Sequence, residues 1–404
     1  MTRALIAGLL AATLYAAAGS AGATEAQTQA PPNAPPEAKP NAQPGAAARP
    51  AAPRANAKPL AKAPAKPPAK PAPKPSARLP AQGPAYADRP DAVALADSLA
   101  AAQGLDAGWV RTQIARARFV PAVPRLIMPP PAGTAKNWAA YRARFIEPDR
   151  LKAGAAFWRE HERWLAAAET RYGVPSEIVV GVIGVETFYG RILGDFRVLD
   201  ALATLSLDFP SGRSDRSPFF REELGHFLKL AQVQGFDPAS VRGSFAGAMG
   251  LGQFMPGSIN RHAVDFDGDG HIDMAGSAAD VIGSVANYLA RHGWQPGLAT
   301  HYAVKPPVDS RARATLLGPD ILPSFSAAQM AELGAELDDA GRAHTGPLAL
   351  VELQNGDAAP SYVAGTQNFY AVTRYNWSSY YALAVIELGR AVARQRDAAA
   401  SPRP

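Results

Sequence analysis

A Pro- and Ala-rich stretch, residues 24–85, is the feature that most restricts what this chain can fold into. It has Lys or Arg at intervals and few large apolar side chains, so it cannot bury a hydrophobic core. This composition is typical of extended, semi-rigid tethers. We therefore expect a disordered linker at 24–85, one folded region at 86–395 and a disordered tail at 396–404.

The first 23 residues have the parts of an export signal. Arg3 provides a short positive region, residues 4–18 are apolar, and residues 21–23 form an A-x-A-like cleavage site. A membrane anchor is the alternative, but the apolar run is short for a spanning helix. The 404 residues include no Cys, which excludes disulfides, thiolate metal sites and thiol catalysis. We expect a soluble, exported protein.

The positive charge of the chain is confined to its first part. Residues 1–85 contain ten Lys and Arg but two acidic residues, a net charge of +8, whereas the whole chain carries +6. Residues 86–404 therefore carry −2, and this balance gives no support for nucleic-acid binding by the folded region. The linker is either a solvated spacer or a segment attracted to anionic envelope polymers.

Helical periodicity dominates residues 86–395, which predicts an α+β protein that is mainly α. Residues 302–365 differ, because short apolar runs alternate there with Gly, Pro and Asp, and this pattern predicts a small β-rich insertion. We expect helices at 91–103, 107–118, 152–172, 219–233, 277–291 and 378–394, and one that begins with Ser176 as its cap and ends near Gly190.

One carboxylate, Glu186, follows the apolar segment 179–185. Positions 179, 182, 183 and 186 lie on one helical face, so a helix that buries the Val and Ile residues carries Glu186 to the edge of the core. Desolvation there raises the pKa of a carboxyl group, and an acid that is protonated near neutral pH can protonate a leaving-group oxygen. A structural Glu, paired with an Arg or capping another helix, is the alternative.

Two further segments have side chains suited to sugars. Residues 244–256 are Gly-rich but match neither a phosphate loop nor a dinucleotide fingerprint. Small residues there allow close approach to a backbone or a sugar ring, and Gln253 has donors and an acceptor for hydroxyls and amides. Residues 367–370 and 374–381 concentrate aromatic and amide groups that can stack on sugars. Tight packing in the core is the alternative for both.

Residues 265–273 have the pattern of an EF-hand calcium loop. Carboxylates occupy loop positions 1, 3, 5 and 9, with Gly at position 6. Gly276 replaces the usual Glu at position 12, so Asp280 is the candidate closing ligand, although it is also placed to form a capping box with Ser277. We expect a structural Ca²⁺ ion, held by Asp265, Asp267, Asp269, His271 and Asp280.

Together these motifs resemble the membrane-bound lytic murein transglycosylase B family. The resemblance covers about residues 95–395 and rests on segments 184–190, 246–256, 265–273, 284–288 and 374–378. It implies a lysozyme-like core with an additional α-helical subdomain, a small β-rich subdomain and an EF-hand-like calcium site. Gly257 departs from the Ser expected after Pro256, which we expect to loosen this loop. The lack of Cys indicates a member without a lipid anchor.

The resemblance also implies a function. It implies a periplasmic enzyme that cleaves the MurNAc–GlcNAc β-1,4 bond of peptidoglycan and leaves a 1,6-anhydro-MurNAc end, with Glu186 as the sole catalytic carboxylate. No organic cofactor is implied, the chain is expected to be a monomer, and other cell-wall enzymes are candidate partners. Matching positions of the glycan groove are Ser244, Gln253, Phe254, Tyr288, Tyr375 and Asn376, with Tyr141 and Tyr380 as further candidates.

A single carboxylate is compatible with this chemistry. Glycosidases usually need two carboxylates, but attack by the C6 hydroxyl of the sugar removes the need for one that activates water. A hydrolytic muramidase with the same acid is one alternative, and a non-catalytic, calcium-dependent glycan-binding protein is another.

Overall fold

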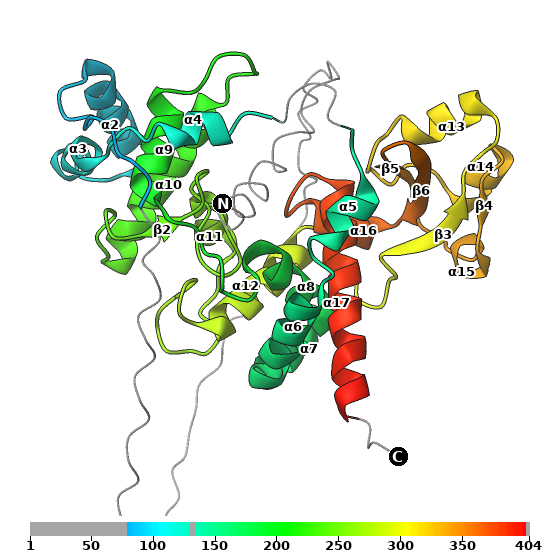
Figure 1. The fold of residues 1–404 in the computed structure, drawn as a ribbon. Helices are drawn as coiled ribbons and strands as arrows, with labels where there is room; N and C mark the ends of the chain where they lie inside the picture. Colours follow the sequence, from blue (N-terminus) through cyan, green and yellow to red (C-terminus); the bar gives the residue numbers. More distant parts are fainter. Residues whose placement is uncertain (1–78, 130–134, 401–404) are drawn as a thin grey trace, which may run out of the picture. The chain divides into compact units, whose positions relative to one another are not determined.

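The computed structural model describes residues 79–129 and 135–400. The predicted export signal, almost all of the predicted linker and residues 401–404 lie outside the described residues. The described chain is mainly helical with small antiparallel sheets (Figure 1). The prediction of an α+β, mainly α protein is therefore confirmed.

The helix that carries Glu186, α8 (Ser176–Thr187), is buried on nearly all sides. The sequence pattern predicted one apolar face, but a helix that is apolar all round belongs in the centre of a domain. It packs against the last helix, α17 (Ser379–Ala400), which is red in Figure 1. A Cβ atom on Gly181 would lie 2.2 Å from the carbonyl oxygen of Val385, so this position requires glycine for the two backbones to approach.

Two helices replace the single one predicted at 152–172. They are α6 (Pro148–Glu160) and α7 (Glu162–Tyr172), and the chain leaves helical geometry between them at His161, with φ −114° and ψ 21°. The His161 ring packs on Phe157, with 4.5 Å between the ring centroids. The other helices outside the β-rich insertion are α2 (Pro90–Gln103), α3 (Ala107–Arg116), α4 (Ala122–Leu126), α5 (Trp138–Ala143), α9 (Val198–Leu207), α10 (Ser217–Gln234), α11 (Pro256–His262), α12 (Ala278–Arg291) and α16 (Gln367–Thr373).

The predicted β-rich insertion contains a four-stranded antiparallel sheet. Its strand order is β4-β3-β6-β5, and Gly365 of β6 lies opposite both His301 and Ala349 on the neighbouring strands. A separate small apolar core, which includes Met330 and Leu350, supports this subdomain. Its elements are β3 (His301–Lys305), α13 (Ser310–Leu317), α14 (Ala327–Glu332), β4 (Glu336–Leu337), α15 (Asp339–Arg342), β5 (Ala349–Asn355) and β6 (Ala358–Gly365), and a two-residue pair, β1 (Phe196–Arg197) with β2 (Arg242–Gly243), lies elsewhere in the chain.

The folded region begins earlier than residue 86. The N–H of Gly83 donates a hydrogen bond to the carbonyl oxygen of Phe119 at 2.7 Å, and the Gln82 amide donates to Asp200 at 2.9 Å. Tyr86 is buried, and its hydroxyl donates to Asp208 at 2.6 Å. At the other end, α17 continues past the predicted boundary at 395 to its last residue at 400.

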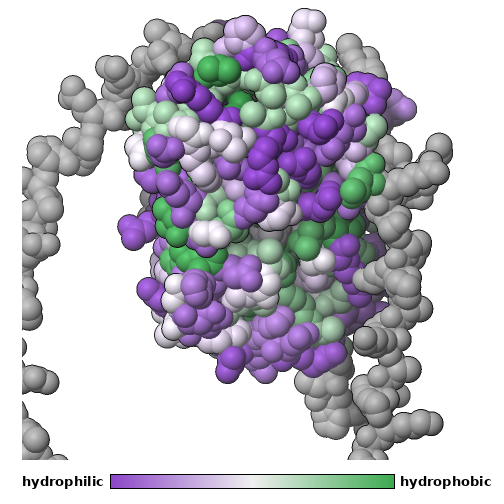
Figure 2. Space-filling view, turned by 90° about the vertical axis from the view of Figure 1, so that its left-hand side faces the viewer, coloured by the Kyte–Doolittle hydropathy of each residue, from purple (hydrophilic) through white to green (hydrophobic). Residues whose placement is uncertain are grey.

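The surface of the described region carries no continuous apolar band on the face shown in Figure 2, where hydrophobic and hydrophilic side chains are interspersed. Within residues 79–129 and 135–400, none of the helices has the length and apolarity needed to cross a bilayer. Single exposed apolar side chains are ordinary on such surfaces. The large ones here are Leu79, Val93, Val233, Val308, Leu322 and Trp377.

Candidate active site

Glu186 lies one residue before the end of α8 and is half-buried among apolar neighbours. Burial raises the pKa of its carboxyl group to about 8, and a hydrogen bond from Tyr381 opposes part of this rise. The Tyr381 hydroxyl donates to Glu186 Oε1 at 2.6 Å. The group is therefore mostly protonated at neutral pH, which is the state that a general acid needs.

The chain turns sharply after Glu186. α8 ends at Thr187, and the next three residues, Phe188, Tyr189 and Gly190, have positive φ angles of 53°, 55° and 83°. Two successive non-glycine residues in this region are uncommon, and such strain is concentrated at functional sites. The predicted glycine is thus the last of three left-handed residues, and Phe188 is the residue that caps the helix.

The start of α8 also differs from the prediction. Ser176 is the first helical residue, and Pro175 occupies the N-cap position without a side-chain cap. The Ser176 N–H and hydroxyl both donate to the Glu169 carboxylate, at 3.0 and 2.7 Å. The helix therefore begins with a contact to α7, because a carboxylate from the preceding helix accepts the hydrogen bond that a local cap would accept.

A buried cation holds the end of α8. Arg150 of α6 is 2% exposed, and its Nη1 donates to the carbonyl oxygen of Gly184 at 2.6 Å. Its guanidinium also lies 4.3 Å from the centre of the Phe188 ring, and Arg191 lies 4.7 Å from that centre. A cation at a helix C-terminus satisfies a free carbonyl and complements the helix dipole. No sequence pattern indicated Arg150, because it is distant along the chain from α8.

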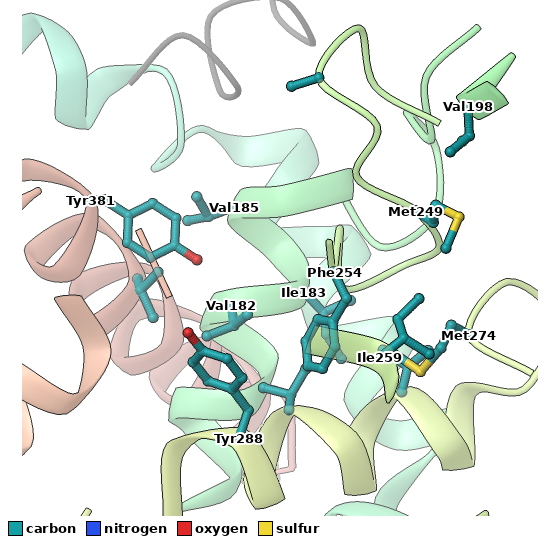
Figure 3. Packing of buried hydrophobic residues seen from close by; sticks show 14 of the residues in the cluster. Val182, Ile183, Val185, Val198, Met249, Phe254, Ile259, Met274, Tyr288 and Tyr381 are labelled. Atoms are coloured by element: carbon teal, nitrogen blue, oxygen red, sulfur yellow. The ribbon is translucent and has the colours of Figure 1, made fainter. Parts of the chain in front are cut away.

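A row of aromatic rings leads away from Glu186. The rings of Tyr381 and Tyr375 are stacked with centroids 6.3 Å apart, and Tyr375 lies 5.0 Å from Tyr288. Phe254 contacts both Tyr288 and Tyr375, at 5.6 and 5.5 Å. Figure 3 shows Phe254, Tyr288 and Tyr381 around α8. Three of the predicted groove residues are thus brought together beside Tyr381.

The two further candidates for the glycan groove, Tyr141 and Tyr380, lie together in another aromatic cluster. The Tyr380 hydroxyl accepts a hydrogen bond from the Gln354 N–H at 2.6 Å, in the β-rich subdomain. Tyr380 and Tyr141 meet edge to face at 5.9 Å, beside Trp138. Tyr381, which contacts Glu186, was not among the predicted site residues. Tyr380 and Tyr381 point in different directions from the same helix, and only the packing of that helix shows which one faces the acid.

The Gly-rich segment forms a tight hairpin next to α8. Met249 and Phe254 exchange backbone hydrogen bonds of 2.9 and 3.0 Å. At the tip, a Cβ atom on Gly250 would lie 2.1 Å from the carbonyl oxygen of Met274, so the backbone approaches another backbone there. The Thr187 hydroxyl donates to the Leu251 carbonyl at 2.9 Å. This contact joins the hairpin to the end of the helix that carries Glu186.

Three polar side chains of the predicted groove, those of Gln253, Ser244 and Asn376, differ in their hydrogen bonds. Gln253 has φ 50°, and its Nε2 donates to the carbonyls of Leu193 and Gly250 at 3.2 and 3.0 Å, which leaves Oε1 as an acceptor. Ser244 Oγ accepts hydrogen bonds from two nearby backbone N–H groups. Asn376 is buried, and its Oδ1 has no hydrogen-bond partner within the described part of the chain. Of these atoms, Gln253 Oε1 is left as an acceptor for a ligand.

The predicted calcium loop gathers part of its expected ligands. Oxygens of Asp265, Asp267 and Asp280 lie within 4.8 Å of one another. Asp280 accepts hydrogen bonds from the loop N–H groups of Phe266 and Asp273, both at 2.8 Å, so its side chain faces the loop. Burial raises its pKa, and the charges of Asp267 and Asp265 add to the rise. Three mutually repelling carboxylates fit a hard cation with oxygen ligands.

The remaining residues of this loop have other contacts. Asp269 and the His271 side chain lie outside the carboxylate group, and Asp269 accepts the His271 N–H at 2.8 Å. In EF-hands the residue at this position coordinates through its backbone carbonyl. Ser277 accepts the Asp280 N–H as an N-cap at 3.2 Å, but Asp280 does not return the contact as a capping box would require.

The chain is similar to known lytic transglycosylases. A family model described as "Transglycosylase SLT domain" matches residues 88–390. The chain is 40% identical, over 322 residues, to membrane-bound lytic murein transglycosylase B of Escherichia coli (strain K12), which covers 78% of this chain and 86% of that protein.

Solved structures agree. The E. coli lytic transglycosylase Slt35, solved in complex with bulgecin A and in complex with calcium, has a TM-score of 0.67 at 39% identity, covering 77% of this chain and 95% of that one. The catenated lytic transglycosylase SltB1 of Pseudomonas aeruginosa has a TM-score of 0.69 at 38% identity, with coverage of 77% and 99%. The chain therefore belongs to the transglycosylase SLT domain family, in its lytic murein transglycosylase B branch.

Proposed function

We propose that this chain is a lytic transglycosylase that cleaves the MurNAc–GlcNAc β-1,4 bond of peptidoglycan and leaves a 1,6-anhydro-MurNAc end, with Glu186 as both acid and base. The observation that carries the proposal is the pKa of Glu186, about 8, set by burial and by one tyrosine hydroxyl. Among the described residues, no second carboxylate contributes to this shift. A mechanism that uses one carboxylate suits this environment better than one that uses two.

In the first step, protonated Glu186 gives its proton to the glycosidic oxygen. The bond between C1 of MurNAc and that oxygen breaks, and the GlcNAc unit leaves with a free 4-hydroxyl group. Positive charge develops at C1, where the carbonyl oxygen of the N-acetyl group of MurNAc can assist, as in substrate-assisted glycosidases. Glu186 is now a carboxylate in an apolar setting, and the Tyr381 hydroxyl stabilises the negative charge at Oε1.

In the second step, the carboxylate acts as the base. It removes the proton from the C6 hydroxyl of MurNAc, O6 attacks C1, and the 1,6-anhydro ring closes. Glu186 is protonated again, so the cycle consumes no water. A pKa of about 8 suits both roles, because general acid–base catalysis is most efficient when the pKa is near the operating pH.

The groove is proposed to run along the aromatic rings beside Tyr381. The rings of Phe254, Tyr288 and Tyr375 provide faces for sugar rings, and Gln253 Oε1 accepts hydrogen bonds from hydroxyl or amide groups. Asn376, whose side chain is buried, remains a proposed groove position. Ser244, Tyr141 and Tyr380 remain proposed groove positions. Tyr141 lies close enough to Tyr381 to raise its pKa, whereas Tyr380 contacts the β-rich subdomain.

We also propose that Asp265, Asp267 and Asp280 bind a structural Ca²⁺ ion, with Asp269 and the His271 carbonyl as additional loop ligands. The relative Slt35, solved in complex with calcium, supports this assignment. Peptidoglycan strands are the proposed partner and the periplasm the proposed compartment, reached after removal of residues 1–23. The monomeric state, the absence of nucleic-acid binding and contacts with other cell-wall enzymes remain proposals.

The test is the chemistry of the product. Purified sacculi are digested with the wild-type chain and, in parallel, with Glu186→Gln, and the muropeptides are analysed by mass spectrometry. We expect anhydro-MurNAc ends, which contain one water fewer than hydrolysed ends, from the wild type and none from the variant. Reducing MurNAc ends instead would identify a hydrolytic muramidase, and binding without cleavage would identify a glycan-binding protein.

A further inference from the structure

Gly257 stands where a Ser was expected, and the structure gives a reason for the change. Its backbone N–H donates a hydrogen bond of 2.7 Å to Oε2 of Glu223, a residue of α10 that is 5% exposed. A Cβ atom on Gly257 would lie 2.9 Å from Glu223 Oε1, which is closer than real Cβ atoms come to their neighbours. Glycine here does not leave the loop loose, because it makes room for a buried carboxylate.

This contact replaces a missing helix cap. α11 begins at Pro256, and the N-cap residue, Met255, provides no side-chain cap. The N–H groups of a first helical turn have no partners within the helix, and a negative charge is favourable at that end. Glu223 supplies both an acceptor and a carboxylate from the neighbouring helix. Burial raises the pKa of Glu223, and the Gly257 N–H and the charge of Arg261 oppose the rise.

Gly257 closely follows the hairpin that carries two of the proposed groove residues. Only Met255 and Pro256 separate it from Phe254, whose backbone pairs with Met249 to close the hairpin. Gln253, in left-handed geometry at the tip of the hairpin, precedes Phe254. α10 packs on α9 and α2 as well as on α11. The contact between Glu223 and Gly257 therefore attaches the end of the hairpin to a long helix that other helices hold in place.

We propose that Glu223 is a positioning residue for glycan binding: its carboxylate holds the Gly257 N–H and so fixes the base of the hairpin that presents Gln253 and Phe254. This inference rests on the proposed function. It assigns a role to a buried acid that does not act on the substrate. The requirement at position 223 differs from the requirement at position 186. At position 223 a hydrogen-bond acceptor is required, whereas at 186 a transferable proton is required.

The test uses four variants of the full mature chain: Glu223→Gln, Glu223→Ala, Gly257→Ala and the double variant Glu223→Ala/Gly257→Ala. Cleavage of a soluble GlcNAc–MurNAc oligosaccharide gives KM and kcat, and calorimetry in the Glu186→Gln background gives Kd for the same oligosaccharide. Glu223→Gln is the matched control, because an amide oxygen still accepts the Gly257 N–H. We expect its KM and Kd to lie close to the wild-type values and well below those of Glu223→Ala, with a small rise for the lost charge.

For Glu223→Ala and Gly257→Ala we expect KM and Kd to rise about tenfold, in the range for the loss of a hydrogen bond to a charged group, with kcat within about twofold. The double variant should match either single variant, because both remove one contact. Equal losses in Glu223→Gln and Glu223→Ala, additive losses in the double variant, or a lowered melting temperature with unchanged KM would each overturn the inference. Failure of the Glu186→Gln parent to bind the oligosaccharide would instead contradict the proposed function.

Discussion

The hydroxyl of Tyr381 donates a hydrogen bond of 2.6 Å to Oε1 of Glu186, across the interface between α17 and α8. Burial raises the pKa of Glu186, and this hydrogen bond lowers it. The balance between the two effects keeps the acid protonated at neutral pH and limits the cost of ionising it. The pKa of Tyr381 is raised by burial and by the negative charge of Glu186, so Tyr381 remains a donor.

Replacing Tyr381 by Phe should therefore raise the pKa of Glu186 further and reduce turnover. Without the hydroxyl, the carboxylate formed in the first step loses a charge-assisted hydrogen bond, worth about 1.5–3 kcal/mol. We expect kcat to fall by about 10- to 100-fold and the alkaline limb of the pH–rate profile to move to higher pH. Tyr380→Phe is the matched control, since its hydroxyl contacts Gln354, and it should leave this limb in place. Equal profiles for both variants would contradict the role of Tyr381.

Glu186→Gln should remove turnover and stabilise the fold at alkaline pH. Gln keeps the shape but has no transferable proton, so we expect less than about a hundredth of wild-type activity on sacculi, given the 10²–10⁴-fold contribution of acid–base catalysis. In the wild type the pKa of Glu186 in the folded chain, about 8, lies above the ordinary value of 4.5 for this group. Between these values the unfolded chain is ionised while the folded chain holds its proton, so stability falls as pH rises through this window.

The Glu186→Gln variant has no carboxyl group at this position, so it does not lose stability in this pH window. Its melting temperature, measured by calorimetry from pH 4 to pH 8, should equal that of the wild type near pH 4 and exceed it increasingly up to about pH 8. Glu177→Gln, at the other acidic position of α8, serves as the control and should show no such divergence. A difference in melting temperature that is constant with pH would mean that burial does not perturb Glu186 as described.

Calcium should stabilise the fold without taking part in the chemistry. A ligand that binds only the native state adds about 2.7 kcal/mol of stability at a hundred times its Kd. We expect chelation to lower the melting temperature and Asp267→Ala, within the carboxylate group, to abolish this effect. Asp269→Asn should retain most of it, because an amide oxygen still coordinates at this loop position. Identical melting curves with excess calcium and with chelator would reject the site.

The start of the folded region can be tested by truncation. A chain that begins at Leu79 keeps Gln82, Gly83 and Tyr86 and should melt like the mature chain. One that begins at Asp88 loses the buried Tyr86 ring and its hydrogen bond to Asp208, so we expect it to be less stable by about 2–4 kcal/mol. Equal denaturant midpoints for the two chains would place the boundary where the sequence alone put it.

The same Leu79 chain tests the linker. It should cleave soluble fragments as fast as the mature chain but act more slowly on intact sacculi at low salt, since the residues that it lacks, 24–78, carry a net charge of +7. The difference should fade as salt shortens the Debye length to about 8 Å near physiological ionic strength. Equal rates on sacculi at low salt would reduce the linker to a passive spacer.

The local features of this protein could be predicted from its sequence. Apolar periodicity located the helix that ends in Glu186, the alternation of short apolar runs located the β-rich subdomain, and the spacing of Asp265, Asp267 and Asp269 indicated a calcium loop. These features depend on residues that are neighbours along the chain, so their patterns are visible without the fold. The motif order was sufficient to indicate the family.

Which residues that are distant along the chain meet depends on the tertiary structure. Tyr381 and not Tyr380 contacts Glu186, because the rotation of α17 against α8 sets which side chain faces the acid. The tertiary structure placed the buried Arg150 at the end of α8 and Glu223 against Gly257. It also made α8 a central helix rather than a surface one, since burial on all sides depends on what packs around it. None of these contacts leaves a spacing pattern, and each depends on side chains brought together by folding.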